Sequence, residues 1–160
     1  MKKNGFTLIE TIIAITIAGV ISSMLFVVIT TGIDSWGFLR GQKKLMQEVK
    51  GVLIRMTKEI RRVKSNSSSN IITFTPGDFK FVDIDDNMIE YKRNGANLER
   101  NGSILLSGIA SPDGLHFTYL DGSGNVATIE SNINVVQFNL VVQDGKNVVR
   151  LSSGAGIRNR

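Results

Sequence analysis

The chain has 160 residues and a formal charge of +5 at neutral pH, which is enough material for one folded domain. A hydrophobic content of 42% excludes a disordered chain, and the absence of cysteine excludes a disulfide framework, a thiolate zinc site and an iron–sulfur cluster. The single histidine, His116, excludes a histidine-based metal cluster.

An apolar run near the N-terminus extends over 23 residues, from Thr11 to Ile33, without a single charge. At about 1.5 Å per residue, a helix of this length crosses the roughly 30 Å hydrocarbon layer of a bilayer. The run is too long for the apolar part of a signal peptide, and no small-x-small cleavage site follows it. We therefore predict a membrane-spanning helix, in which Gly19, Ser22 and Ser23 form a small-residue face open to another helix.

One carboxylate, Glu10, lies at the edge of this apolar zone. A carboxylate in the hydrocarbon layer costs at least about 2.5 kcal/mol unless it is paired, so such a residue is a functional candidate by default. The alternative is that Glu10 lies close enough to the membrane surface to stay hydrated.

The segment Lys2–Glu10, KKNGFTLIE, joined to the apolar run, resembles the prepilin peptidase site of type IV pilins and type II secretion pseudopilins. The resemblance implies a leader of residues 1–5, cleavage between Gly5 and Phe6, and N-methylation of Phe6. A glycine before the cut lets a peptidase approach the backbone closely. The resemblance also implies that Glu10 meets the terminal ammonium of a neighbouring subunit, a pair that low dielectric strengthens.

Residues 34–64 are predicted to continue the helix as an amphipathic segment. Its apolar positions follow helical spacing and form one apolar stripe, which we expect to pack on a sheet: Leu45, Val49, Val52, Leu53, Met56, Ile60 and Val63. Gly32, Gly37 and Gly41 are weak helix formers and predict a kink or a melted turn near residues 32–41.

The basic segment, residues 40–64, holds nine basic and two acidic residues and has a net charge of +7. Its basic face either binds DNA or anionic headgroups, or is a solvated face or a contact with acidic subunits. No aromatic residues interleave with the charges, which argues against a nucleic-acid platform. The positive-inside rule favours a cytoplasmic Arg40–Lys50, whereas the peptidase motif requires a cytoplasmic N-terminus and a periplasmic C-terminal domain. We follow the motif, because long domains translocate despite their charge.

From Ser65 to Asn70 the chain is polar, which predicts the end of the helix, and residues 65–160 then alternate with period two. Nine short runs predict an antiparallel sheet joined mostly by hairpins: residues 71–75, 79–84, 88–93, 98–100, 104–109, 115–120, 126–129, 133–142 and 148–151. The predicted fold class is α+β and pilin-like, with a long N-terminal helix packed on an antiparallel β-rich domain.

The sheet domain offers little chemistry, so we predict that the protein is not an enzyme and has no cofactor. His116 is expected to be exposed, on the strand face opposite Leu115 and Phe117. Asp121, Ser123 and Asn125 resemble the start of a calcium loop, but Asn132 stands where a calcium loop has Glu. Cation binding is also conceivable at three further acidic residues, namely Asp83, Asp85 and Asp86.

Loose similarities point to J-type minor pseudopilins and the related W-type minor pilins; they lie at residues 56–62, 89–92, 98–100, 115–121 and 156–160. The absence of cysteine departs from major pilins that close a C-terminal disulfide loop. The resemblance implies an inner-membrane minor subunit at a filament tip, whose partners are prepilin peptidase, other subunits and the assembly platform. The alternatives are a competence pilus subunit involved in DNA uptake, and a single-pass membrane-anchored binding protein outside any filament.

Overall fold

The computed structural model describes residues 7–158. The chain divides into two compact units, Met1–Arg40 and Gly41–Arg160. The predicted cleavage and methylation positions, Gly5 and Phe6, lie outside the described residues.

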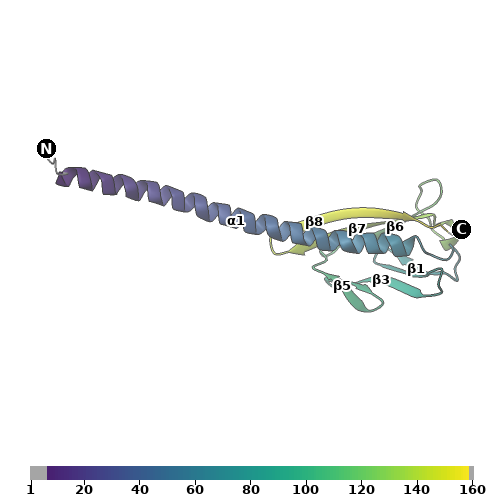
Figure 1. Ribbon diagram of the computed structural model, residues 1–160. Coiled ribbons are helices and arrows are strands. Elements are labelled where there is room, and N and C mark those ends of the chain that lie inside the picture. Colours follow the sequence, from purple (N-terminus) through teal and green to yellow (C-terminus); the bar gives the residue numbers. More distant parts are fainter. Residues whose placement is uncertain (1–6, 159–160) are drawn as a thin grey trace. The chain divides into compact units, whose positions relative to one another are not determined.

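A single long helix, α1, runs from Leu8 to Ile60 without interruption (Figure 1). The melted turn predicted at residues 32–41 is therefore wrong. Each glycine costs a helix about 1 kcal/mol relative to alanine, and the hydrogen bonding continues in spite of that cost. The helix also ends before Lys64, because Val63 already forms an antiparallel bridge with Asp83.

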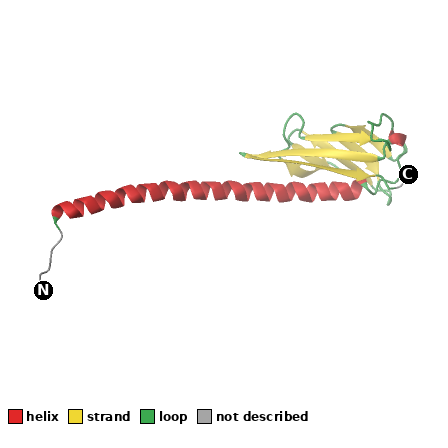
Figure 2. Cartoon of the chain, turned by 90° about the horizontal axis from the view of Figure 1, so that it is seen from above, coloured by secondary structure: helices red, strands yellow, loops and turns green. Residues whose placement is uncertain are grey.

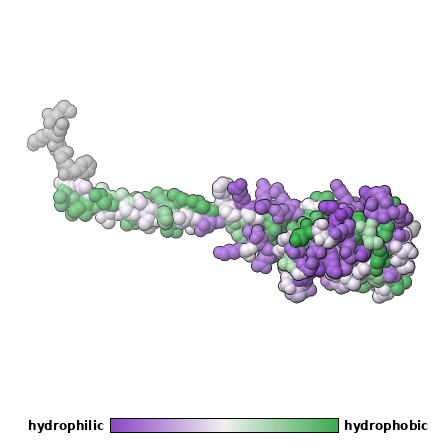
Figure 3. All heavy atoms as spheres, turned by 90° about the horizontal axis from the view of Figure 1, so that it is seen from below, coloured by the Kyte–Doolittle hydropathy of each residue, from purple (hydrophilic) through white to green (hydrophobic). Residues whose placement is uncertain are grey.

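The part of α1 in the first unit is apolar on all sides. Every described residue from 7 to 40 is exposed except Thr30, which is half-buried. This part is long and apolar enough to cross a membrane, and Figure 3 colours most of it green for hydrophobic. Five hydroxyl groups donate to backbone carbonyls of their own helix within 3.0 Å, those of Thr16, Ser23, Thr30, Thr31 and Ser35. Such bonds satisfy these hydroxyl groups within the helix, which matters in the hydrocarbon layer of a membrane because it offers no hydrogen-bond partners.

The second unit contains the end of α1 and two antiparallel sheets (Figure 2). The first sheet has the order β1-β2-β3-β4-β5, with β1 Ile71–Thr75, β2 Asp78–Val82, β3 Met88–Asn94, β4 Asn97–Arg100 and β5 Ser103–Ser107. The second has the order β6-β7-β8, with β6 Leu115–Leu120, β7 Val135–Asp144 and β8 Asn147–Gly156. A short 3₁₀ helix, η1, covers Glu130–Asn132. The α+β pilin-like fold is thus confirmed.

Short turns connect most neighbouring strands, whereas residues 121–134, which include η1, connect β6 to β7. Between β4 and β5 the turn residues are Asn101 and Gly102, both at positive φ, 50° and 78°. Asn-Gly is the preferred pair for a turn of this hand, because its twist matches that of the flanking strands. Gly95, at a φ of 60°, likewise lies in the turn between β3 and β4.

One predicted strand, residues 126–129, is wrong, whereas the other eight runs overlap observed strands. Val126 forms only an isolated bridge with Leu120, and the chain then turns into η1. Strand β6 forms its ladder with β7 along its whole length, and residues 126–129 form no ladder with it beyond that one bridge. The alternation of apolar residues in this run did not reveal that the run has no strand to pair with.

The core lies between the second part of α1 and the sheets. All seven residues of the predicted apolar stripe are buried, which confirms that this face packs on the domain. The largest fully buried side chains facing it are aromatic, namely Phe79, Phe81, Tyr91, Phe117 and Phe138. Burial of each such side chain contributes roughly 1.5–3 kcal/mol. His116 is exposed, as predicted.

Polar contacts fix α1 to both sheets. Thr57 and Ser153 share a hydrogen bond of 3.1 Å, which ties the helix to β8. Near the start of the unit, Gln42 Nε2 donates to the Val148 carbonyl at 3.3 Å. Toward the first sheet, Glu59 accepts hydrogen bonds from Tyr91 of β3 and Arg100 of β4. The helix face is therefore held at a defined rotation over the domain.

Candidate functional site

Glu10 lies in the first turn of α1, where it forms a reciprocal contact with Thr7. The Thr7 backbone N–H donates to Glu10 Oε2, and the Glu10 N–H donates to Thr7 Oγ1, both at 3.4 Å. This pattern is a capping box, in which the side chain of each residue accepts a hydrogen bond from the backbone N–H of the other, a donor that has no partner within the helix. Glu10 therefore stabilises the start of its own helix, whatever else it contacts.

The capping box is a feature that the sequence contains and that our sequence reasoning missed. Thr7-Leu8-Ile9-Glu10 matches the spacing of Ser or Thr followed three residues later by Glu, just before an apolar run. Glu10 thus has two candidate roles, one local and one between subunits. Since glutamine can also cap, a change to glutamine separates them.

Two large aromatic residues follow the apolar run, Trp36 and Phe38, with exposed fractions of 70% and 46%. Tryptophan is enriched where a spanning helix meets the membrane surface, because its ring is apolar and its N–H needs a polar partner. These residues mark one end of the apolar part of α1. The sequence already contains this signal, since Trp36 and Phe38 follow the uncharged run within five residues, but our sequence analysis did not interpret it.

The basic segment is not uniform. Four of its cations contact carboxylates: Lys44 with Glu48, Arg55 with Glu59, Arg62 with Asp85, and Lys64 with Asp86. The last two pairs join the end of α1 to the turn between β2 and β3. The acidic residues proposed as a cation site, Asp85 and Asp86, are therefore partners of the chain's own basic groups.

The remaining candidates for calcium, Asp83 and Asp121, hold turns. Asp83 Oδ1 accepts from the backbone N–H groups of Asp85 and Asn87, both at 2.9 Å. Asp121 Oδ1 accepts from those of Ser123 and Asn125, at 2.8 and 2.9 Å, and these bonds lower the pKa of Asp121. Within residues 7–158, no group of three acidic or histidine side chains lies close enough to hold a metal ion.

Glu59 is the centre of a half-buried network. Tyr91 Oη and Arg100 Nε donate to Glu59 Oε2 at 2.6 and 2.8 Å, and Arg55 Nε donates to Oε1 at 3.1 Å. Burial favours the neutral acid, but the bonds from Arg100, Tyr91 and Arg55 outweigh it and hold the pKa of Glu59 below its ordinary value. Burial and the Glu59 carboxylate raise the pKa of Tyr91. In this network Glu59 and Arg100 stay ionised and Tyr91 stays neutral, and their hydrogen bonds link the helix to the sheet.

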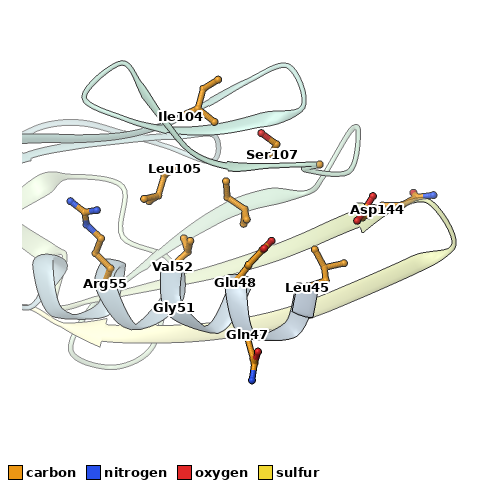
Figure 4. Close-up of a pocket in the computed structure, with 13 residues that line it drawn as sticks. Leu45, Gln47, Glu48, Gly51, Val52, Arg55, Ile104, Leu105, Ser107 and Asp144 are labelled. Atoms are coloured by element: carbon orange, nitrogen blue, oxygen red, sulfur yellow. The ribbon is translucent and has the colours of Figure 1, made fainter. Parts of the chain in front are cut away.

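A groove of about 690 Å³ lies between α1 and strand β5. In Figure 4, Leu45, Val52 and Arg55 project from the helix toward the strand that carries Ile104 and Leu105. Of its charged groups, Arg55 pairs with Glu59, and Glu48 pairs with Lys44.

Comparisons with known proteins agree with the N-terminal pattern. The family model of the prokaryotic N-terminal methylation motif matches residues 1–26. No curated protein and no solved structure matches the chain. A methylation motif, a long apolar helix and antiparallel sheets together support a subunit of the type IV pilin or pseudopilin type, held by a membrane helix.

Proposed function

We propose that this protein is a minor pseudopilin or minor pilin, made as a precursor and cleaved between Gly5 and Phe6. Residues 6–33 hold it in the inner membrane, with the N-terminus in the cytoplasm and the domain in the periplasm. Its work is assembly, at or near the tip of a filament. The observation that carries the proposal is the methylation motif joined directly to an uninterrupted apolar helix.

In the proposed filament, the Glu10 carboxylate pairs with the methylated terminal ammonium of Phe6 in a neighbouring subunit. The side chain of Glu10 is exposed in the single chain, so it is accessible to a partner. Each charge alone is costly in an apolar environment, and together they stabilise each other. The pair would therefore fix the register of one subunit against the next.

Placement among the J-type or W-type minor subunits rests on the sequence similarities and on the absence of cysteine. A competence subunit that handles DNA is less well supported, because four basic residues of the basic segment already contact the chain's own carboxylates. The filament that we propose is a type II secretion pseudopilus or a type IV pilus.

The test is the intact mass and N-terminal sequence of the protein isolated from its native membrane. We expect a chain that begins at Phe6 and carries one methyl group, and an uncut chain in cells without prepilin peptidase. A chain that still begins at Met1 in cells with active peptidase would contradict the proposal and leave a membrane-anchored protein with a folded domain.

A further inference from the structure

Four cations lie in a row along one exposed face at the end of α1 in the second unit. Lys43, Lys50 and Lys58 belong to α1, and Arg61 directly follows its last residue, Ile60; they are separated by seven, eight and three residues, spacings that return to the same side of a helix. All four are exposed, and we call them the cationic stripe. At about 1.5 Å per residue, the stripe is about 27 Å long.

The stripe differs from four other cations of the basic segment, Lys44, Arg55, Arg62 and Lys64, in lacking acidic partners. Among residues 7–158, no carboxylate lies within 4 Å of its four charged groups, whereas Lys44, Arg55 and Lys64 each have one and Arg62 has two. The two acids of this part of the helix, Glu48 and Glu59, pair with Lys44 and Arg55. The stripe is thus a row of like charges, which mildly destabilises the isolated helix and attracts an acidic surface.

An apolar groove accompanies the stripe. Ile54 lies between Lys50 and Lys58 and is 57% exposed, although it is surrounded by charge. Together with Leu53 of the helix and Leu151 of β8 it lines a groove of about 450 Å³. Since β8 is an edge strand, the groove is bordered by α1 on one side and by the outer strand of the second sheet on the other. The surface therefore offers an apolar centre and a cationic rim.

We propose that this surface docks an acidic amphipathic helix of a different filament subunit. An apolar side chain of that helix fills the groove at Ile54, and carboxylates one and two turns away face Lys50, Lys58 and Arg61. This inference rests on the proposed function and adds the chemistry of the neighbour. A helix in a groove is recognised through such regularly spaced anchors.

The observations favour an unlike subunit over other occupants. A second copy would present the same cations on this part of its helix, and the two acids there, Glu48 and Glu59, are already paired, so like charges would oppose each other. Nucleic acid is disfavoured because the stripe has an aliphatic centre and no aromatic residue on which a base can stack.

The test is site-specific photo-crosslinking of the full-length protein in its native membrane, with benzoylphenylalanine in place of Ile54. We expect an adduct with a different protein that carries its own N-terminal methylation motif. The crosslinked peptide should be helical and should contain Asp or Glu within one or two turns of the attachment point. Lys50→Glu with Lys58→Glu should lower the yield by at least about tenfold, because like charges then face each other. Reversal of the partner's acids to lysine should restore it.

The matched control is Lys92→Glu with Lys146→Glu, which makes the same charge change at an exposed position of β3 and an exposed position of the turn between β7 and β8. This control should leave the adduct unchanged, and protease resistance should show that both double variants are folded. An adduct with a second copy or with nucleic acid, an adduct indifferent to the stripe, or no adduct would each overturn the inference. The mass of the N-terminal peptide in the same sample tests the proposed function separately, because an unprocessed chain contradicts that function whatever the crosslink shows.

Discussion

Glu10→Gln should abolish incorporation of the protein into filaments while leaving it processed and inserted in the membrane. Glutamine keeps the hydrogen bond to Thr7 that caps α1, but it cannot neutralise a terminal ammonium. Loss of one partner of a desolvated ion pair costs about 3–5 kcal/mol, which is more than about a hundredfold in association. Filament incorporation is measured by shearing and sedimentation, and processing by intact mass.

Two further variants divide the local role from the role between subunits. Thr7→Ala removes the threonine side of the cap and should cost the helix only about 1 kcal/mol, so assembly should largely persist. Glu10→Ala removes both cap and charge and should fail as Glu10→Gln does. If Glu10→Gln assembled normally and only Glu10→Ala failed, the cap would explain the carboxylate and the subunit pairing would be wrong.

Glu59→Ala should lower the free energy of unfolding of the domain by about 2–3 kcal/mol, because Arg100 and Tyr91 would lose their acceptor in a half-buried site. The measurement is urea denaturation of the detergent-solubilised full chain, followed by circular dichroism of the sheets. Glu48→Ala is the matched control, since the Glu48 side chain is 51% exposed and its contact with Lys44 is 3.9 Å long. That control should change stability by less than about 0.5 kcal/mol.

The same network predicts a dependence of stability on acid. The pKa of Glu59 is lower in the folded chain than in the unfolded chain, so its contribution is complete above the unfolded value, about 4.3. As the pH falls through the folded value, the carboxylate protonates and the contribution is lost. Glu59→Gln should therefore flatten the loss of stability below about pH 4.3, measured by the same urea titrations. An unchanged slope would contradict the network's electrostatic role.

The elements of this fold could be predicted where the pattern is local. Burial of the seven-residue apolar stripe follows from helical spacing, and the inward face of β6, with Leu115, Phe117 and Tyr119, follows from alternation. The uninterrupted helix could not be predicted from its glycines, because propensity at three positions does not decide a helix of 53 residues. The motif at residues 2–10 predicted the family pattern because its residues are contiguous.

Contacts between distant residues could not be predicted. Glu59 lies 32 residues before Tyr91 and 41 before Arg100, and no spacing rule brings these side chains together. The division of the basic segment into paired and unpaired cations depends in the same way on the turn at Asp85 and Asp86. Local contacts are accessible to sequence reasoning: the members of the capping box, Thr7 and Glu10, are three residues apart, and the pairs Lys44–Glu48 and Arg55–Glu59 are four apart.

The order of strands in the two sheets has a consequence for how the domain matures. Every named strand pairs only with strands that adjoin it in the chain, and all these connections are short except residues 121–134 between β6 and β7, so most pairings close a loop at small entropic cost. Such hairpins form rapidly and without help from remote segments. The apolar stripe of α1, by contrast, shares one core with residues far along the chain, including Phe138 and Leu140 of β7. Pairing of the strands can thus precede docking of the helix, and the emerging domain buries its core only when that helix face reaches the sheets.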